Sequence, residues 1–138
     1  MPEKKGAEVY LKYLTDQGYR PEVDPDGDIT FKKEGGTYLI LVDEKDEQFF
    51  QLAYPNFWPF TTEEQRQVAL EACNFANTKT KVTKVSISAN KNVWATIELF
   101  VAKREDFIPV LDRALSAIGT GIKRFMEKTQ ELASPPKA

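Results

Sequence analysis

The sequence predicts an α+β fold in which an antiparallel sheet of five strands is flanked by helices. Three observations predict this class: helical apolar periodicity at both ends and in the middle of the chain, short strand-like runs between them, and hairpin-length turns within those runs. Short turns favour antiparallel pairing, so the expected order is αβββαββα. The 138 residues are expected to form a single domain, ordered over about residues 5 to 131 with frayed ends.

The first helix is expected over about residues 5 to 17. Its apolar residues recur at helical spacing along one face, and Gly18 can end it in a left-handed conformation. The turn-forming residues 24 to 27 then reverse the chain before a strand at about residues 28 to 34, where apolar and polar residues alternate. The chain therefore changes from helix to strand near Tyr19.

Two further strands are expected at about residues 37 to 42 and 48 to 54. Gly35-Gly36 connects the first of them to the preceding strand, because glycine accepts the positive φ of a tight hairpin turn. The acidic residues 43 to 47 form a solvated loop before the second. The three strands together form a meander.

The middle helix is expected to begin at a capping box formed by Thr61 and Glu64 and to continue to about Asn77. Its apolar stripe consists mainly of alanines and includes Cys73, the only cysteine. A cysteine in such a stripe packs as a small hydrophobic residue, so we expect it to be buried and unreactive.

Two strands near residues 81 to 89 and 92 to 102 form the last hairpin, joined at Asn90-Lys91-Asn92 because asparagine tolerates left-handed φ. A long amphipathic helix is then expected from about residue 105 to 131. It contains Gly119 and Gly121, each of which costs about 1 kcal/mol relative to alanine. Close backbone approach or a bend would explain these glycines.

This order of elements resembles the type III secretion chaperone-like fold and, within it, the YbjN-like family of bacterial sensory transduction regulators. The local matches are Leu14 through Gly18-Tyr19 leading to Asp26-Gly27, and Asn74-Phe75-Ala76-Asn77 before Lys81-Val82. The resemblance covers about residues 5 to 130. It implies a non-enzymatic, often dimeric protein, and it supplies no catalytic residues.

The chemistry-bearing residues predict no catalytic, cofactor or metal site. Histidine is absent, which excludes Ser-His-Asp and Cys-His arrangements and histidine-containing zinc sites. Counted as a calcium-binding EF-hand loop, the acidic run from Asp24 places Ile29 where glycine is required. We therefore interpret this run as a turn and residues 43 to 47 as a solvated loop, with adventitious calcium as the alternative for the latter.

The charge balance and the termini bear on partners and location. With 19 basic and 21 acidic residues the net charge is -2, so a positive field for nucleic acid is missing, although Lys79, Lys81, Lys84 and Lys91 near Trp94 allow a minor nucleic-acid hypothesis. No run is long and apolar enough to span a membrane, and no secretory signal follows the start. A cytoplasmic protein without a membrane partner is expected.

Unusual apolar residues indicate a surface that binds another protein. Strands such as residues 38 to 42 are apolar on both faces, and the segment from residue 54 to 60 combines four aromatics with two prolines. A core covered by helices on both faces, and a loop that plugs the core, are the alternatives. The candidate partner-binding residues are Tyr54, Phe57, Trp58, Phe60, Trp94 and Phe100.

The function predicted from these observations is a non-enzymatic protein-binding domain, chaperone-like or sensory and regulatory, that acts as a homodimer on a protein partner or client polypeptide. Two alternatives stay open. One is a small-ligand binder or a carboxylate-only enzyme in the loops around residues 43 to 47 and 54 to 60. The other is a structural or regulatory subunit of a larger complex that acts through its terminal tails.

Overall fold

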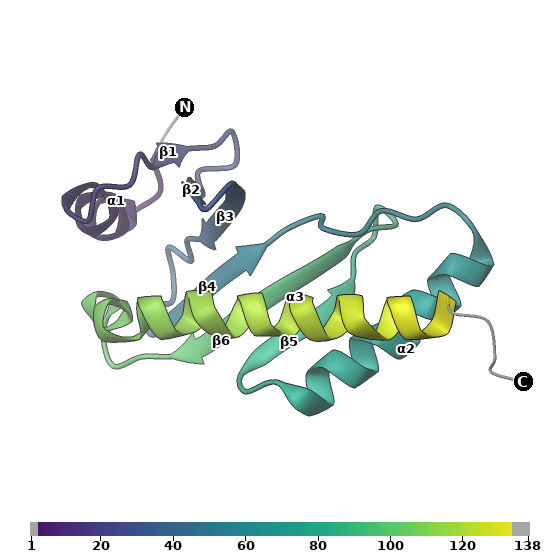
Figure 1. Cartoon of the computed structure of the whole chain (residues 1–138). Coiled ribbons are helices and arrows are strands. Elements are labelled where there is room, and N and C mark those ends of the chain that lie inside the picture. The colour runs from purple at the N-terminus through teal and green to yellow at the C-terminus, as the bar shows by residue number, and fades with distance from the viewer. Residues whose placement is uncertain (1–2, 134–138) are drawn as a thin grey trace, which may run out of the picture.

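The computed structural model of the chain describes residues 3 to 133 and contains an antiparallel six-stranded sheet with three α-helices and one 3-10 helix (Figure 1). The strand order is β1-β2-β3-β4-β6-β5. The elements are α1 (Ala7–Asp16), β1 (Glu22–Val23), β2 (Ile29–Lys33), β3 (Gly36–Leu41), β4 (Phe49–Tyr54), α2 (Glu63–Lys79), β5 (Thr83–Ile87), β6 (Val93–Phe100), η1 (Arg104–Val110) and α3 (Leu111–Ala133). The α+β class is confirmed, and the ends assigned to fraying lie mostly outside the described residues.

The predicted number of five strands is wrong, because β1 adds a sixth at the edge of the sheet. Glu22 pairs with Thr30 and Val23 with Ile29. The turn between them is held by Asp24, whose Oδ1 accepts hydrogen bonds from the backbone N–H groups of Asp26 and Asp28. A strand of two residues is too short to show alternation, so the sequence pattern does not reveal it.

The first hairpin turns one residue earlier than predicted. Lys33 pairs with Gly36, so the two turn residues are Glu34 and Gly35, with φ of 51° and 83°. Gly36 lies in β3 because the ring of Tyr54 covers it: a Cβ atom there would lie 2.5 Å from a ring carbon. The glycine pair thus serves two needs, a left-handed turn at one residue and close packing at the next.

Three further boundaries differ from prediction. The capping box of α2 is Thr62 with Gln65 instead of Thr61 with Glu64. In the β5–β6 hairpin the left-handed residue is Lys91, with φ 59°, and not a neighbouring asparagine. The last helix begins as the 3-10 helix η1, which contains Pro109, and becomes α-helical only at Leu111.

The helices α1 and α3, together with η1, pack on the same face of the sheet, and the other face is left open. The rings of Tyr10 in α1 and Phe107 in η1 lie 6.2 and 5.6 Å from that of Phe50. A Cβ on Gly121 of α3 would lie 2.8 Å from Cγ2 of Thr83, on the same face. In Figure 1, α3 crosses β4, β6 and β5, while α1 and β1 to β3 form a lobe at one end.

The helix α2 lies against α3 and closes the outer edge of β5. The side-chain amide of Asn77 donates to the carbonyl of Val85 at 3.1 Å and accepts from the N–H of Val85 at 2.7 Å. Both hydrogen bonds that a neighbouring strand would make with Val85 are therefore made by one side chain. At Val85 this edge is satisfied without a further strand.

Candidate functional site

The structure separates the six predicted partner-binding residues onto the two sides of the sheet. Phe57 and Trp58 pack on α3, where their ring centroids lie 5.2 and 5.4 Å from that of Phe125. Phe60 is buried, and Tyr54 and Phe57 remain half-buried. The loop that follows β4 thus closes the core over the second half of α3, as the core-plug alternative requires.

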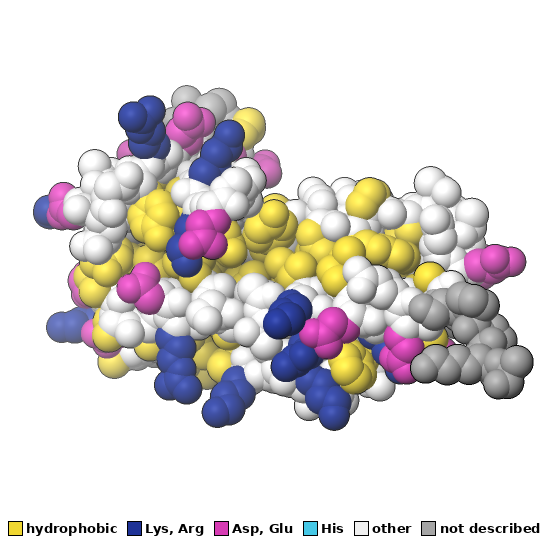
Figure 2. Space-filling model, viewed as in Figure 1, with side chains coloured by type: hydrophobic (Ala, Val, Ile, Leu, Met, Phe, Trp, Pro, Cys, Tyr) yellow, Lys and Arg dark blue, Asp and Glu magenta, His cyan; other side chains and the backbone are white. Residues whose placement is uncertain are grey.

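A continuous series of aromatic rings runs through this loop. Successive centroids are 5.1 to 6.4 Å apart, in the order Tyr19, Phe31, Tyr38, Tyr54, Phe57, Phe125, Trp58 and Phe60. Several of these rings are only half-buried, and Figure 2 shows hydrophobic surface between the α1 lobe and α3. Stacked, tilted and edge-on rings at such distances stabilise each other beyond their buried area, so the series adds to the stability of the core.

Trp94 and Phe100 lie on the open face of the sheet. The indole Nε1–H of Trp94 donates to Oδ1 of Asn56 at 2.9 Å, which ties this face to the aromatic loop. Phe100 is 88% exposed, the largest exposure of the apolar side chains that are described as exposed, and its ring lies 6.0 Å from that of Phe49. A salt bridge between Lys84 and Glu98 occupies the same face. The open face is therefore mixed, with aromatic and charged side chains.

Two carboxylates of the acidic segments, those of Asp28 and Asp43, hold loops. Oδ1 of Asp28 accepts from Nζ of Lys4 and from the N–H of Val42, both at 2.9 Å. Oδ1 of Asp43 accepts from the N–H groups of Lys45 and Asp46, both at 3.0 Å. Among residues 3 to 133 no group of three or more acidic or cysteine side chains could hold a metal ion.

Cys73 is buried between α2 and the core, as expected. Its side chain is 7% exposed, and burial raises the pKa of its thiol to about 11. The thiolate is the reactive form, so this thiol is protonated at neutral pH and a poor nucleophile.

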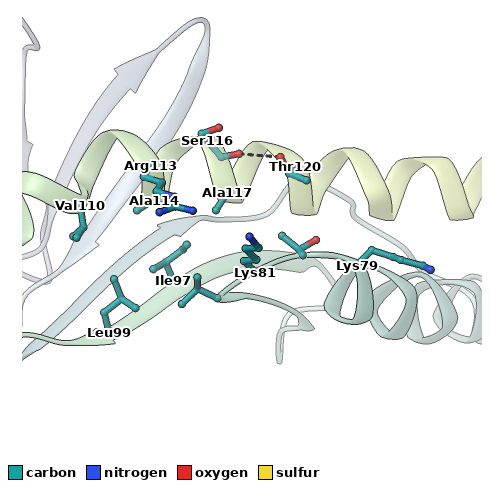
Figure 3. Close-up of a pocket in the computed structure, with 12 residues that line it drawn as sticks. Lys79, Lys81, Ile97, Leu99, Val110, Arg113, Ala114, Ser116, Ala117 and Thr120 are labelled. Carbon is teal, nitrogen blue, oxygen red and sulfur yellow. Dashed lines mark hydrogen bonds between the residues drawn. The ribbon is translucent and has the colours of Figure 1, made fainter.

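A concave site that combines charge with apolar surface lies under the first half of α3, at the opposite end from the aromatic loop (Figure 3). It has a volume of about 520 Å³ and is open to solvent on one side. Its apolar walls are Val82, Ile97, Leu99, Val110, Ala114 and Ala117; its polar residues are Lys79, Thr80, Lys81, Arg113, Ser116 and Thr120. We call this site the basic cavity.

Within residues 3 to 133, the cations of the basic cavity have no acidic partner in a salt bridge. No ion pair among the described residues involves Lys79, Lys81 or Arg113, and no described residue that lines the cavity is acidic. Lys79 extends away from the cavity, and its Nζ lies over the ring of Phe75, 5.8 Å from the centroid. Lys81 and Arg113 are the cations that face the opening in Figure 3.

A strained residue forms one side of the basic cavity. Val82 has φ 61°, a left-handed conformation that a β-branched residue rarely adopts, and the N–H of Thr83 donates to the carbonyl of Lys81 at 2.7 Å. The side chain of Val82 is 59% exposed, so its burial does not explain the strain. This tight turn fixes the backbone that carries Lys81.

Sequence reasoning missed the basic cavity, although it noticed some of its residues. The sequence groups Lys79, Lys81, Lys84 and Lys91, near Trp94, as a minor hypothesis for a nucleic-acid surface. The structure places the first two at the cavity and Lys84 on the open face beside Glu98, so they do not form one surface. No local pattern connects them to Arg113, which lies about a quarter of the chain away.

Comparison with known proteins identifies no relative: no model of a known protein family matches the chain, and no curated protein matches its sequence. In the part of the chain that the structure describes, no helix is long and apolar enough to cross a membrane. The resemblance to the YbjN-like family stays a prediction.

Proposed function

We propose that this chain is a non-enzymatic protein-binding domain, chaperone-like or regulatory in role, that acts as a homodimer through the open face of its sheet. The observation that carries the proposal is the exposed Phe100 beside the half-buried Phe49, at the end of a sheet face that α1, η1 and α3 leave uncovered. An aromatic side chain that remains 88% exposed is an anchor that a partner can bury.

The chemistry of the chain supports a binding role. Its thiol is buried and protonated, and the carboxylates of Asp28 and Asp43 are engaged in loop hydrogen bonds. Trp94, tied to Asn56, extends the aromatic content of the open face beyond Phe49 and Phe100. Phe57 and Trp58 of the loop after β4 are half-buried and lie against α3, so they offer further apolar surface on the other side of the sheet.

Sedimentation velocity over a range of concentrations tests the dimer. The wild type is expected to dimerise, and Phe100→Ser to weaken the dimer by at least about a hundredfold, because a two-fold interface contains the residue twice. Leu70→Ser, which removes an apolar side chain 40% exposed on α2, is the matched control and leaves association unchanged. A wild type that remains monomeric at every soluble concentration contradicts the dimer.

Affinity capture from native lysate separates the two aromatic surfaces as partner sites. Trp94→Ala changes the open face, whereas Trp58→Ala changes the loop that packs on α3. We expect Trp94→Ala to lose the captured protein and Trp58→Ala to retain it, provided that circular dichroism shows both variants folded. Unchanged capture by Trp94→Ala would assign the partner to another surface.

A further inference from the structure

We propose that the basic cavity binds a small amphiphilic carboxylate, with the carboxylate between Lys81 and Arg113 and the hydrocarbon chain on the apolar walls. The walls formed by Ile97 and Leu99 belong to the helix-covered face, whereas the proposed protein partner binds the open face; Val82 borders both. The proposal therefore goes beyond the proposed function and does not rest on it.

The size of the basic cavity fits a ligand of this class. Its volume of about 520 Å³ falls in the range of known small-molecule sites, roughly 300 to 1,000 Å³. The small side chains of Ala114 and Ala117 leave room between α3 and β6, where larger residues would close the core. Such sites bind by apolar area and use a few polar groups to fix the orientation of the ligand.

The charge of the basic cavity selects an anion. Lys81 and Arg113 lack acidic partners among the described residues, although acidic residues outnumber basic ones in the chain as a whole. Guanidinium and ammonium groups both form charge-assisted hydrogen bonds with carboxylate, and Arg can do so with two N–H groups at once. Thr80 and Thr120 line the same cavity, but their hydroxyls donate to the carbonyls of Ala76 and Ser116, so the two cations are the groups left for the anion.

The strained turn at Val82 is a second, independent feature of the site. Residues held in rare backbone conformations cost about 1 to 3 kcal/mol and are concentrated at ligand sites, where they fix a group in position. Val82 holds the preceding residue, Lys81, at the opening of the cavity. A glycine would adopt this conformation without strain, so the valine points to a requirement for a fixed, apolar residue at this place.

Isothermal titration calorimetry with decanoate tests the proposal. We expect saturable binding with a dissociation constant on the order of 100 μM, typical for a ligand of this size. Acetate, which has the charge without the chain, and decyltrimethylammonium, which has the chain with the opposite charge, should bind at least about tenfold more weakly. Absence of saturable decanoate binding at about 1 mM, or equal binding of the cationic amphiphile, overturns the proposal.

Variants locate the site. The double variant Lys81→Gln, Arg113→Gln should lose at least about tenfold in decanoate affinity, whereas Lys123→Gln, an exposed residue of α3 outside the cavity, should change it less than twofold. Ala117→Phe should fill the cavity and abolish binding. Should Ala117→Phe fail to fold, amide NMR chemical-shift mapping of decanoate on the wild type locates the ligand, and shifts confined to residues away from the cavity contradict the proposed site. An equal loss of decanoate affinity in the double variant and in Lys123→Gln contradicts it as well.

Discussion

The two halves of α3 meet the rest of the molecule in opposite ways. The second half is closed, because Phe57 and Trp58 pack their rings on Phe125, whose side chain is fully buried. The first half is open, because alanines face Ile97 and Leu99 across the basic cavity. Packed aromatic rings thus close the core at the second half of α3. At the first half, small side chains leave the core accessible, beside cations that have no acidic partner among the described residues.

The largest expected effect is at the closed half. Phe125→Ala should reduce the free energy of unfolding by about 3 to 5 kcal/mol, because it leaves a cavity beneath two rings. Leu99→Ala at the open half should cost only about 1 kcal/mol, since Leu99 is half-buried on a surface that solvent already reaches. Urea denaturation of both variants measures the difference, and equal losses would contradict the contrast between the halves.

Cys73 tests how tightly α2 closes on the core. With a pKa raised from 9.0 to about 11, its thiolate fraction at pH 8 is lowered by about a hundredfold, and alkylation by iodoacetamide should slow by at least that factor relative to the urea-unfolded chain. Because the folded pKa is the higher one, the associated stability is present below pH 9 and lost as pH rises through about 11. Rapid native alkylation would mean that α2 opens readily.

Two glycines of α3 differ in how closely the rest of the molecule packs against them, so they compare close and open packing within one helix. Gly121→Ala should destabilise by about 1 to 3 kcal/mol, because the new Cβ would lie 2.8 Å from Thr83. Gly119→Ala is the matched control: no atom lies within 4 Å, so it should stabilise by about 0.5 to 1 kcal/mol through helix propensity. Thermal or urea unfolding that gives both changes the same sign would show that α3 does not lie this close to β5.

The smallest expected effect is at the strained turn of the open half. Val82→Gly should raise the free energy of unfolding by about 1 kcal/mol, because it removes left-handed strain at a largely exposed residue. Lys91→Gly, with a similar φ of 59° but an unbranched side chain, should gain less. The same Val82→Gly protein should bind decanoate more weakly, which calorimetry can measure. A lower free energy of unfolding for Val82→Gly would mean that the valine side chain stabilises the fold by packing more than its backbone strain destabilises it.

The periodicity of apolar residues predicted most elements of this fold, but contacts between distant residues determine where some of them begin and end. The long amphipathic pattern of α3 and the alternation of β2 were sufficient to predict these two elements. The first hairpin shifted by one residue because Gly36 is needed under Tyr54, a contact between strands that no local rule contains. The two-residue strand β1 is held by pairing with β2 and by the Asp24 turn, and carries no period of its own.

The candidate sites were less predictable, because they depend on segments that are distant in the chain. The aromatic loop stood out in the sequence, yet much of it serves the core. The basic cavity combines the α2–β5 connection with β6 and the start of α3, and residues such as Ala117 are unremarkable alone. Nothing in the propensity of valine indicates the left-handed turn at Val82.

The two hydrogen bonds between Asn77 and Val85 have a consequence for how copies of this molecule can meet. A sheet edge grows by offering free N–H and C=O groups to the next strand, and here the amide of Asn77 already occupies both groups of Val85. At the opposite edge, β1 offers only two residues. The β5 edge is therefore blocked at Val85 and the β1 edge is short, which limits growth by strand addition and favours assembly through side-chain contacts.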